Sequence, residues 1–305
     1  MVLTTRMEHH SNDLPWRQRA VVKYADVDDR GVLDPAAVEK QLKHNYPRIK
    51  LLAVCGASNV TGHVNDIYHL AAIAHEHKAR IMVDAAQLIP HQRVDMKPDQ
   101  DPCHIDYLAF SGHKIYAPFG TGVLIGPKET FTDGEPEYVG GGTVDLVGSE
   151  QVFWTRPPDR EEAGSPNVIG AFALAKTLQY LQHFDTEKIE KHERNLTAYA
   201  MQQLKTVPGI TIYGSVPRVS VISFNMQGIS HGQLGAALCY EAGIGLRTGC
   251  FFAQPYVRKL LGEQDELKFL PAYKQKNPDK LPGMVRISLA AYNRFDEIDV
   301  LVDWL

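Results

Sequence analysis

The sequence contains little cysteine, no long apolar run and no block of basic residues. Four of its 305 residues are cysteines, Cys55, Cys103, Cys239 and Cys250, and none lie in a Cys-x-x-Cys spacing. This argues against a disulfide framework or a cysteine-based zinc site. No apolar stretch is long enough to span a bilayer, and no signal-peptide pattern opens the chain. The net charge is only −4, without a Lys/Arg cluster, so we expect a cytoplasmic protein without nucleic-acid or membrane partners.

The histidines lack the spacing of a helical metal pair. His9 and His10 are adjacent, and His75 and His77 are two residues apart instead of four. We therefore expect no metal site, and we place His75 and His77 on the exposed part of a helix.

Strand-like and helix-like segments alternate through the first two-thirds of the chain. Apolar strands are predicted at 51–55, 80–83, 105–110 and 122–125, and helices at 66–78, 167–183 and 186–206. This order is typical of an α/β fold with a parallel or mixed sheet covered by helices. Short strands at 211–213, 219–225 and 286–290, with helices at 232–242 and 296–305, predict a smaller α+β domain. The boundary falls near residue 185, dividing a large domain (1–184) from a small one (185–305). Residues 262–284, rich in Lys, Asp, Glu and Pro, are expected to form a surface insertion.

Two polar residues follow neighbouring predicted strands and carry the strongest chemical signal. Asp84 follows the strand 80–83, and Lys114 lies just after the strand 105–110, in Ser111-Gly112-His113-Lys114. Ligands of open α/β sheets bind at the carboxyl ends of strands. A lysine there suits a Schiff base with pyridoxal phosphate (PLP), and an aspartate suits the pyridine nitrogen of PLP. Gln87, one turn after Asp84, is in reach of the phenolic oxygen. The alternative for Asp84 is a helix N-cap.

The resemblance to a known family rests on segments in family order along nearly the whole chain. They are residues 7–16 (MEHHSNDLPW), 57–62 (ASNVTG), 83–87 (VDAAQ), 111–114 (SGHK), 120–122 (GTG), 140–143 (GGGT), 162–167 (EAGSPN), 247–249 (RTG) and 285–289 (VRISL). The chain resembles class V aminotransferases, the fold-type I PLP-dependent transferases, and within them the cysteine desulfurase and selenocysteine lyase group.

This resemblance implies a role for each matching residue. Lys114 would form the Schiff base, Asp84 would pair with the pyridine nitrogen, and His9 would stack on the cofactor ring. Without the resemblance, a histidine after Glu8 is more often a surface or capping residue, and a surface ion pair is the alternative for Arg286. The remaining implied contacts are Gln87 to the ring oxygen, Ser111 and His113 to the phosphate, Thr143 to the phosphate of the other subunit of a homodimer, and Asn59, Arg247 and Arg286 to the substrate.

The chain departs from the family pattern in two places. Family members carry a segment before the Glu8-His9 pair with a Gly-Thr-Thr-like turn that binds phosphate at a helix N-terminus. Residues 1–6 contain no such turn, so we expect the N-terminal part of the large domain to be missing. In the loop Arg247-Thr248-Gly249-Cys250-Phe251-Phe252, the family's reactive cysteine aligns with Phe252. Cys250 would face the same way only in an extended segment, where residues i and i+2 share a side. The alternative is a buried, inert cysteine.

The leading hypothesis is a PLP-dependent enzyme that cleaves the C–S bond of cysteine or a relative, with Cys250 as a candidate sulfur acceptor and a possible acceptor protein as partner. Aminotransferase, C–S lyase or epimerase chemistry without a persulfide remains open, as does a non-catalytic remnant of the fold. Gly140-Gly141-Gly142 predicts a tight turn. It lacks the strand–GxGxxG–helix context of a nucleotide site.

Overall fold

A six-stranded sheet forms the centre of the larger part of the computed structural model, which describes residues 1–263, 265–275 and 280–305. Its strand order is β2-β1-β3-β4-β5-β6. The bounds are Val2–Thr5 (β1), Val22–Ala25 (β2), Leu51–Cys55 (β3), Arg80–Asp84 (β4), Tyr107–Ser111 (β5) and Gly122–Ile125 (β6). All neighbours pair in parallel except β5 and β6, so the prediction of an α/β fold with a mainly parallel sheet is confirmed.

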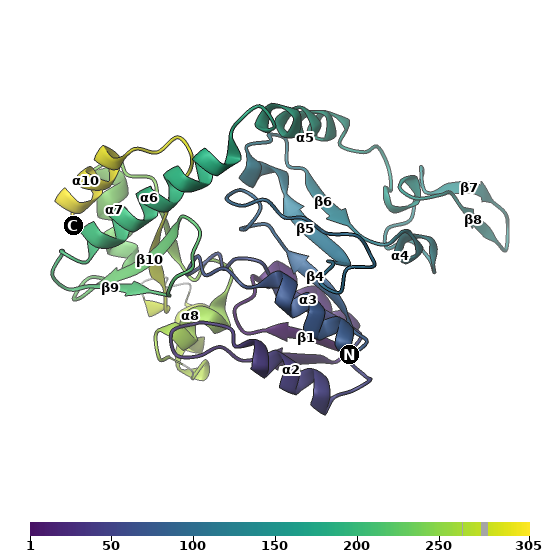
Figure 1. The fold of residues 1–305 in the computed structure, drawn as a ribbon, viewed down its shortest axis with the longest axis horizontal. Helices are drawn as coiled ribbons and strands as arrows, with labels where there is room; N and C mark the ends of the chain where they lie inside the picture. The colour runs from purple at the N-terminus through teal and green to yellow at the C-terminus, as the bar shows by residue number, and fades with distance from the viewer. Residues whose placement is uncertain (264, 276–279) are drawn as a thin grey trace.

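Helices cover this sheet because their apolar faces need burial. The helices α2 (Pro35–His44) and α3 (Ile67–Glu76) lie side by side over the sheet (Figure 1). Helix α3 begins where the Asp66 carboxylate accepts the backbone N–H of His69 at 3.0 Å. It buries Ile67, Leu70, Ala71, Ile73 and Ala74, which agrees with the apolar spacing in the sequence. The short helices of this region are α1 (Leu14–Arg19) and the 3₁₀ turns η1 (His10–Asn12) and η2 (Gly112–Ile115).

The C-terminal third builds a second sheet and a second apolar core. The antiparallel order is β11-β12-β10-β9, with bounds Arg247–Gly249 (β11), Met284–Ser288 (β12), Val221–Met226 (β10) and Ile210–Tyr213 (β9). Its helices are α6 (Thr186–Leu204), α7 (His231–Tyr240), α8 (Gln254–Leu260), α9 (Leu270–Lys274) and α10 (Phe295–Asp303). The second core is built from residues 196–301. The domain boundary expected near residue 185 falls between α5 (Val168–Leu181) and α6; the division itself stays a prediction.

A hairpin extends away from the sheet. Strands β7 (Val144–Val147) and β8 (Val152–Trp154), beside the short helix α4 (Lys128–Thr132) and the 3₁₀ turn η3 (Asp159–Glu161), project from the β6 side (Figure 1). The predicted turn at residues 140–142 is present: Gly142 has φ +95°, and the N–H of Thr143 donates to the carbonyl of Gly140 at 3.3 Å. Several apolar side chains of the hairpin are exposed, namely Leu146, Val147, Val152 and Phe153.

The insertion expected at 262–284 is only partly a surface segment. The 3₁₀ turn η4 (Leu267–Phe269) and α9 bury Phe269 and Ala272, which ties this stretch to the body of the protein. Residues 264 and 276–279 lie outside the described part. In the part of the chain that the structure describes, no helix combines the length and apolar character needed to cross a membrane.

Candidate functional site

The ends of two adjacent parallel strands bring Asp84 and Lys114 to one place. Asp84 is the last residue of β4, and Val83 and Asp84 pair with Leu108 and Ala109 of β5. Lys114 lies in η2, directly after β5. One oxygen of Asp84 accepts the N–H of Ala86 at 2.9 Å and so supports a turn; the helix N-cap expected as an alternative is wrong, because the described chain continues from β4 into a turn and not into a helix. Its other oxygen has no hydrogen-bond partner among the described residues and is available to a ligand.

Burial makes the amine of Lys114 unusually acidic. Desolvation lowers the pKa of Lys114, and the nearby guanidinium of Arg286 lowers it further, while the negative charge of Asp84 acts in the opposite direction. No ion pair within 4.0 Å involves Lys114 among the described residues. A depressed pKa raises the fraction of neutral amine, the form that nucleophilic or base chemistry requires.

His9 faces the same region as a neutral ring. Its Nδ1 accepts the backbone N–H of Ser11 at 3.1 Å, so the proton of the neutral ring is on Nε2. Burial lowers the pKa of His9, and the charge of Lys114 adds to this effect. His9 therefore caps η1 and also lies within electrostatic reach of Lys114; its stacking on a cofactor ring stays a prediction.

Glu8 is a buried acid that the sequence analysis did not single out. Its side chain accepts hydrogen bonds from the hydroxyl of Thr5 at 2.5 Å and from the amide of Asn12 at 2.7 Å. Burial raises the pKa of Glu8 to about 8, and the charge of Asp84 contributes in the same direction. Glu8 is thus protonated at neutral pH behind the site. The polar partner four residues later, Asn12, was the one sequence signal that pointed to it.

The opposite side of the site is a buried, unpaired guanidinium. Arg286 of β12 donates from Nη1 to the carbonyl of Asn59 at 2.8 Å, and its guanidinium carbon lies 4.9 Å from the ring centre of Phe251. Its Nε is buried without a hydrogen-bond partner. Burial lowers the pKa of Arg286 to about 10, and the charge of Arg247, its partner across β11 and β12, adds to the shift.

A surface ion pair, the alternative expected for Arg286, is absent among the described residues. A desolvated guanidinium with a free N–H is a receptor for a carboxylate. The side chain of Asn59 donates to the carbonyl of Phe251 at 2.7 Å, so it holds the loop that packs against Arg286. Arg247 is exposed beside it.

The residues expected at the cofactor's ring oxygen and phosphate are divided between two regions. Ser111 ends β5 and His113 is exposed on η2, each next to Lys114 in space and sequence. Gln87 lies within 3.3 Å of the Nε2 of His91. Thr143 lies in the projecting segment, buried, and donates its hydroxyl to the carbonyl of Gly140 at 2.7 Å. The structure does not bring Thr143 to Lys114 within one chain, and its role in a second subunit stays a prediction.

The loop after β11 differs from the extended segment expected for Cys250. Phe251 and Phe252 have φ values of +51° and +57°, in the left-handed region that non-glycine residues rarely adopt. The condition under which residues 250 and 252 would face the same way, an extended segment, is therefore not met. The ring of Phe252 lies 5.5 Å from that of His9, at the site, where the family pattern places a cysteine.

Cys250 packs against the larger core, and Gln254 and Arg258 of α8 act on the pKa of its thiol. Burial raises the pKa of its thiol, so little thiolate is present at neutral pH. The geometry favours the reading of Cys250 as a packed, unreactive cysteine.

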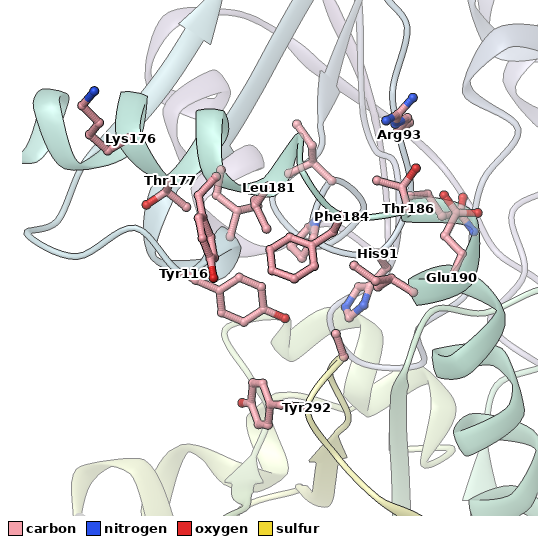
Figure 2. A pocket seen from close by; sticks show the side chains of 17 residues that line it. His91, Arg93, Tyr116, Lys176, Thr177, Leu181, Phe184, Thr186, Glu190 and Tyr292 are labelled. Atoms are coloured by element: carbon pink, nitrogen blue, oxygen red, sulfur yellow. The ribbon is translucent and has the colours of Figure 1, made fainter.

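A cavity of about 900 Å³ adjoins this constellation without containing it. Figure 2 shows Tyr116, Phe184, His91 and Tyr292 around it, from the loop after η2, the α5–α6 connection and the segment after β12. Its lining includes none of the residues expected from sequence to bind cofactor or substrate.

The chain is similar to proteins of one known family. The sequence matches the family model Aminotransferase class-V over residues 1–301. It is 34% identical over 308 residues to the probable cysteine desulfurase 1 of Mycobacterium leprae, covering 99% of this chain and 46% of that protein. It is 32% identical over 309 residues to the probable cysteine desulfurase of Halalkalibacterium halodurans, covering 100% of this chain and 70% of that protein.

Two solved structures are similar over 99% of this chain and 70% of their own. The cysteine desulfurase CsdA of Escherichia coli superposes with a TM-score of 0.85 at 30% identity. The apo cysteine desulfurase of Thermococcus onnurineus superposes with a TM-score of 0.84 at 32% identity.

Proposed function

The chain belongs to the class V aminotransferase family of PLP-dependent enzymes, and we propose that it cleaves the C–S bond of cysteine or a related small amino acid. The observation that carries the proposal is the meeting of Lys114 and Asp84 at adjacent strand ends, with the unpaired guanidinium of Arg286 within their electrostatic reach. The names of the relatives support cysteine as the substrate. That the chain forms a homodimer stays a prediction. That a second protein accepts the sulfur also stays a prediction.

The residues present suit PLP. Lys114 has no fixed partner among the described residues, and Asp84 has one oxygen free. In the proposed arrangement Lys114 holds the cofactor aldehyde, Asp84 binds the pyridine nitrogen, His9 lies against the ring, Gln87 binds the ring oxygen, and Ser111 and His113 bind the phosphate. When bound, PLP supplies the electron sink that stabilises negative charge at the substrate α-carbon.

The chain's own residues then bind the substrate and move its proton. Arg286, held by the carbonyl of Asn59 at 2.8 Å, binds the substrate carboxylate and orients the α-carbon. The lowered pKa of Lys114 raises the fraction of neutral amine that can accept the α-proton when the amine is free. His9 is neutral because burial lowers its pKa. It therefore places no further positive charge beside Arg286 and Lys114.

A second reaction outcome is favoured by the loop around Phe252. Transfer of sulfur to the protein needs a thiolate beside His9, where this chain has Phe252, and burial raises the pKa of the Cys250 thiol. Elimination needs no protein thiolate: the C–S bond breaks, sulfur leaves as sulfide, and water completes the conversion of cysteine to pyruvate, ammonia and hydrogen sulfide. Desulfuration would instead give alanine and a persulfide.

The test combines spectroscopy with product analysis. We expect the purified protein with PLP to show a visible absorbance band that Lys114→Ala abolishes and that Lys176→Ala, in α5, leaves unchanged. When cysteine is added, we expect the wild type to release sulfide and Lys114→Ala to release none. Pyruvate with ammonia identifies elimination, and alanine identifies desulfuration. Absence of the band at saturating PLP, or its persistence in Lys114→Ala, would overturn the proposal.

The proposed homodimer has a structural basis in the hairpin β7–β8. Its exposed apolar side chains leave an apolar surface of the kind that a partner covers, and Thr143 lies at its base. Sedimentation velocity of the wild type against Leu146→Glu tests this: we expect a dimer that the substitution weakens.

A further inference from the structure

Two histidines and an aspartate meet at the edge of the sheet opposite to Lys114. His75 lies near the end of α3, and His104 and Asp106 lie just before β5 begins. The two imidazole rings stack with centroids 4.1 Å apart and planes inclined by 19°. The expectation from sequence that His75 is exposed is wrong, because only 19% of its side chain is accessible.

Backbone carbonyls determine which nitrogen of each ring is free. The Nδ1 of His75 lies 2.8 Å from the carbonyl of Pro102, and the Nδ1 of His104 lies 2.7 Å from the carbonyl of Asp101. Carbonyl oxygens only accept, so both Nδ1 atoms carry protons. This leaves the Nε2 atoms as the variable positions, and both face the carboxylate of Asp106, at 2.9 Å for His75 and 3.6 Å for His104.

A cation between these groups would interact favourably with all three. An ionised carboxylate has only lone pairs to offer, and so has the Nε2 of a ring whose proton is on Nδ1. A metal ion shared by the three groups would accept a lone pair from each of them. Backbone hydrogen bonds from Nδ1 are the usual support that orients a metal-binding histidine.

The spacing agrees with shared coordination. The three ligand atoms lie within 4.8 Å of one another. Two atoms bound tetrahedrally to zinc at about 2.0–2.1 Å lie roughly 3.3 Å apart. This is comparable to the 2.9 Å from His75 Nε2 to Oδ2 of Asp106 and the 3.6 Å from His104 Nε2 to Oδ1 of Asp106. Asp106 also accepts the N–H of Ile81 at 2.8 Å and lies 4.0 Å from the Nε of Arg80. Arg80 is engaged by the hydroxyl of Tyr107 at 2.7 Å and by Glu129 at 3.2 Å.

We propose that His75, His104 and Asp106 bind one divalent transition-metal ion of the zinc class. Two imidazole nitrogens and one carboxylate oxygen form a ligand set that suits zinc, with water in the fourth position. The ion fastens the segment before β5 to the end of α3. Because the site lies at the other end of β5 from Lys114, it is separate from the proposed reaction.

The test uses the PLP-loaded protein stripped of metal with a chelator and titrated with Zn²⁺ and with Co²⁺. We expect one equivalent of tightly bound Zn²⁺, a visible Co²⁺ absorbance typical of four-coordination, and a higher Tm with Zn²⁺. The variants His75→Asn and His104→Asn keep an N–H near each backbone carbonyl while removing Nε2. Each should lose at least tenfold in affinity, together with the Co²⁺ absorbance.

The matched control is His77→Asn. His77 also engages a backbone carbonyl through Nδ1, that of Ile73 at 2.8 Å, but lies outside the cluster, so binding should be unchanged. Asp106→Asn, which can still accept the N–H of Ile81, provides a second variant if a histidine variant fails to fold. Zinc binding of equal affinity in wild type and folded variants, or no stoichiometric binding at all, would overturn the proposal.

Discussion

Replacing Glu8 by glutamine should remove a pH-dependent loss of stability. Between pH 4.5 and 8 the folded protein keeps a proton on Glu8 that the unfolded chain has released, because burial raises the pKa of this carboxyl to about 8. The unfolded state binds fewer protons in this interval, so the free energy of unfolding falls as the pH rises. The interval of about 3.5 pH units, at roughly 1.4 kcal/mol per unit, amounts to about 5 kcal/mol at most.

The variant Glu8→Gln retains the shape and both hydrogen bonds, since its amide donates to Thr5 and its oxygen accepts from Asn12. We expect wild type and variant to be similarly stable at pH 5. As the pH rises to 8.5, the variant should become progressively more stable than the wild type. Urea unfolding at matched PLP content, repeated every half pH unit, measures the difference. Glu76→Gln, at an exposed position of α3, is the control and should show no trend. A difference between Glu8→Gln and wild type that stays constant across this range would refute the reasoning.

Three further predictions concern the substrate site, the thiol and the backbone. Arg286→Lys should lower kcat/KM for cysteine by about 10–100-fold in a steady-state assay, since a bidentate charge-assisted contact is worth roughly 1.5–3 kcal/mol. Arg294→Lys, at an exposed position, is the control and should leave kcat/KM unchanged. Equal effects of the two substitutions would contradict the role of Arg286. Cys250→Ser should keep sulfide release within about twofold, because the thiol is packed and its pKa raised; a loss of tenfold or more would make Cys250 the acceptor. Gly62→Ala should destabilise the protein in urea unfolding by about 1–3 kcal/mol more than Gly228→Ala. Both glycines have positive φ, but only a Cβ at Gly62 would meet a backbone oxygen of β10, at 2.6 Å. Equal losses of stability would refute a steric cause.

Local patterns determined much of the fold. The strands at 51–55 and 122–125 coincide with β3 and β6, because continuous apolar runs next to turn residues have few alternatives. The first two strands and α2 were not predicted from the sequence. Strand β1 is a run of four residues whose strand character depends on pairing with β2 and β3 on either side, a contact between segments distant in sequence.

The proximity of Asp84 and Lys114 could also be predicted. Asp84 and Lys114 each follow a strand directly, and adjacent parallel strands end at the same edge of a sheet, so their proximity follows from local order alone.

Tertiary structure decided the features that depend on burial and on long-range contact. The pKa of Glu8 depends on the burial of its carboxyl group. The Nε of Arg286 is unpaired because no hydrogen-bond acceptor reaches it among the described residues. The left-handed backbone at Phe251 and Phe252 directs Phe252 to His9, whereas Cys250 packs against the core. His75 meets His104 and Asp106 across about 30 residues, without any spacing that marks a metal pair. Hydrogen-bond geometry and desolvation arise only when distant segments pack, so residue order by itself does not specify them.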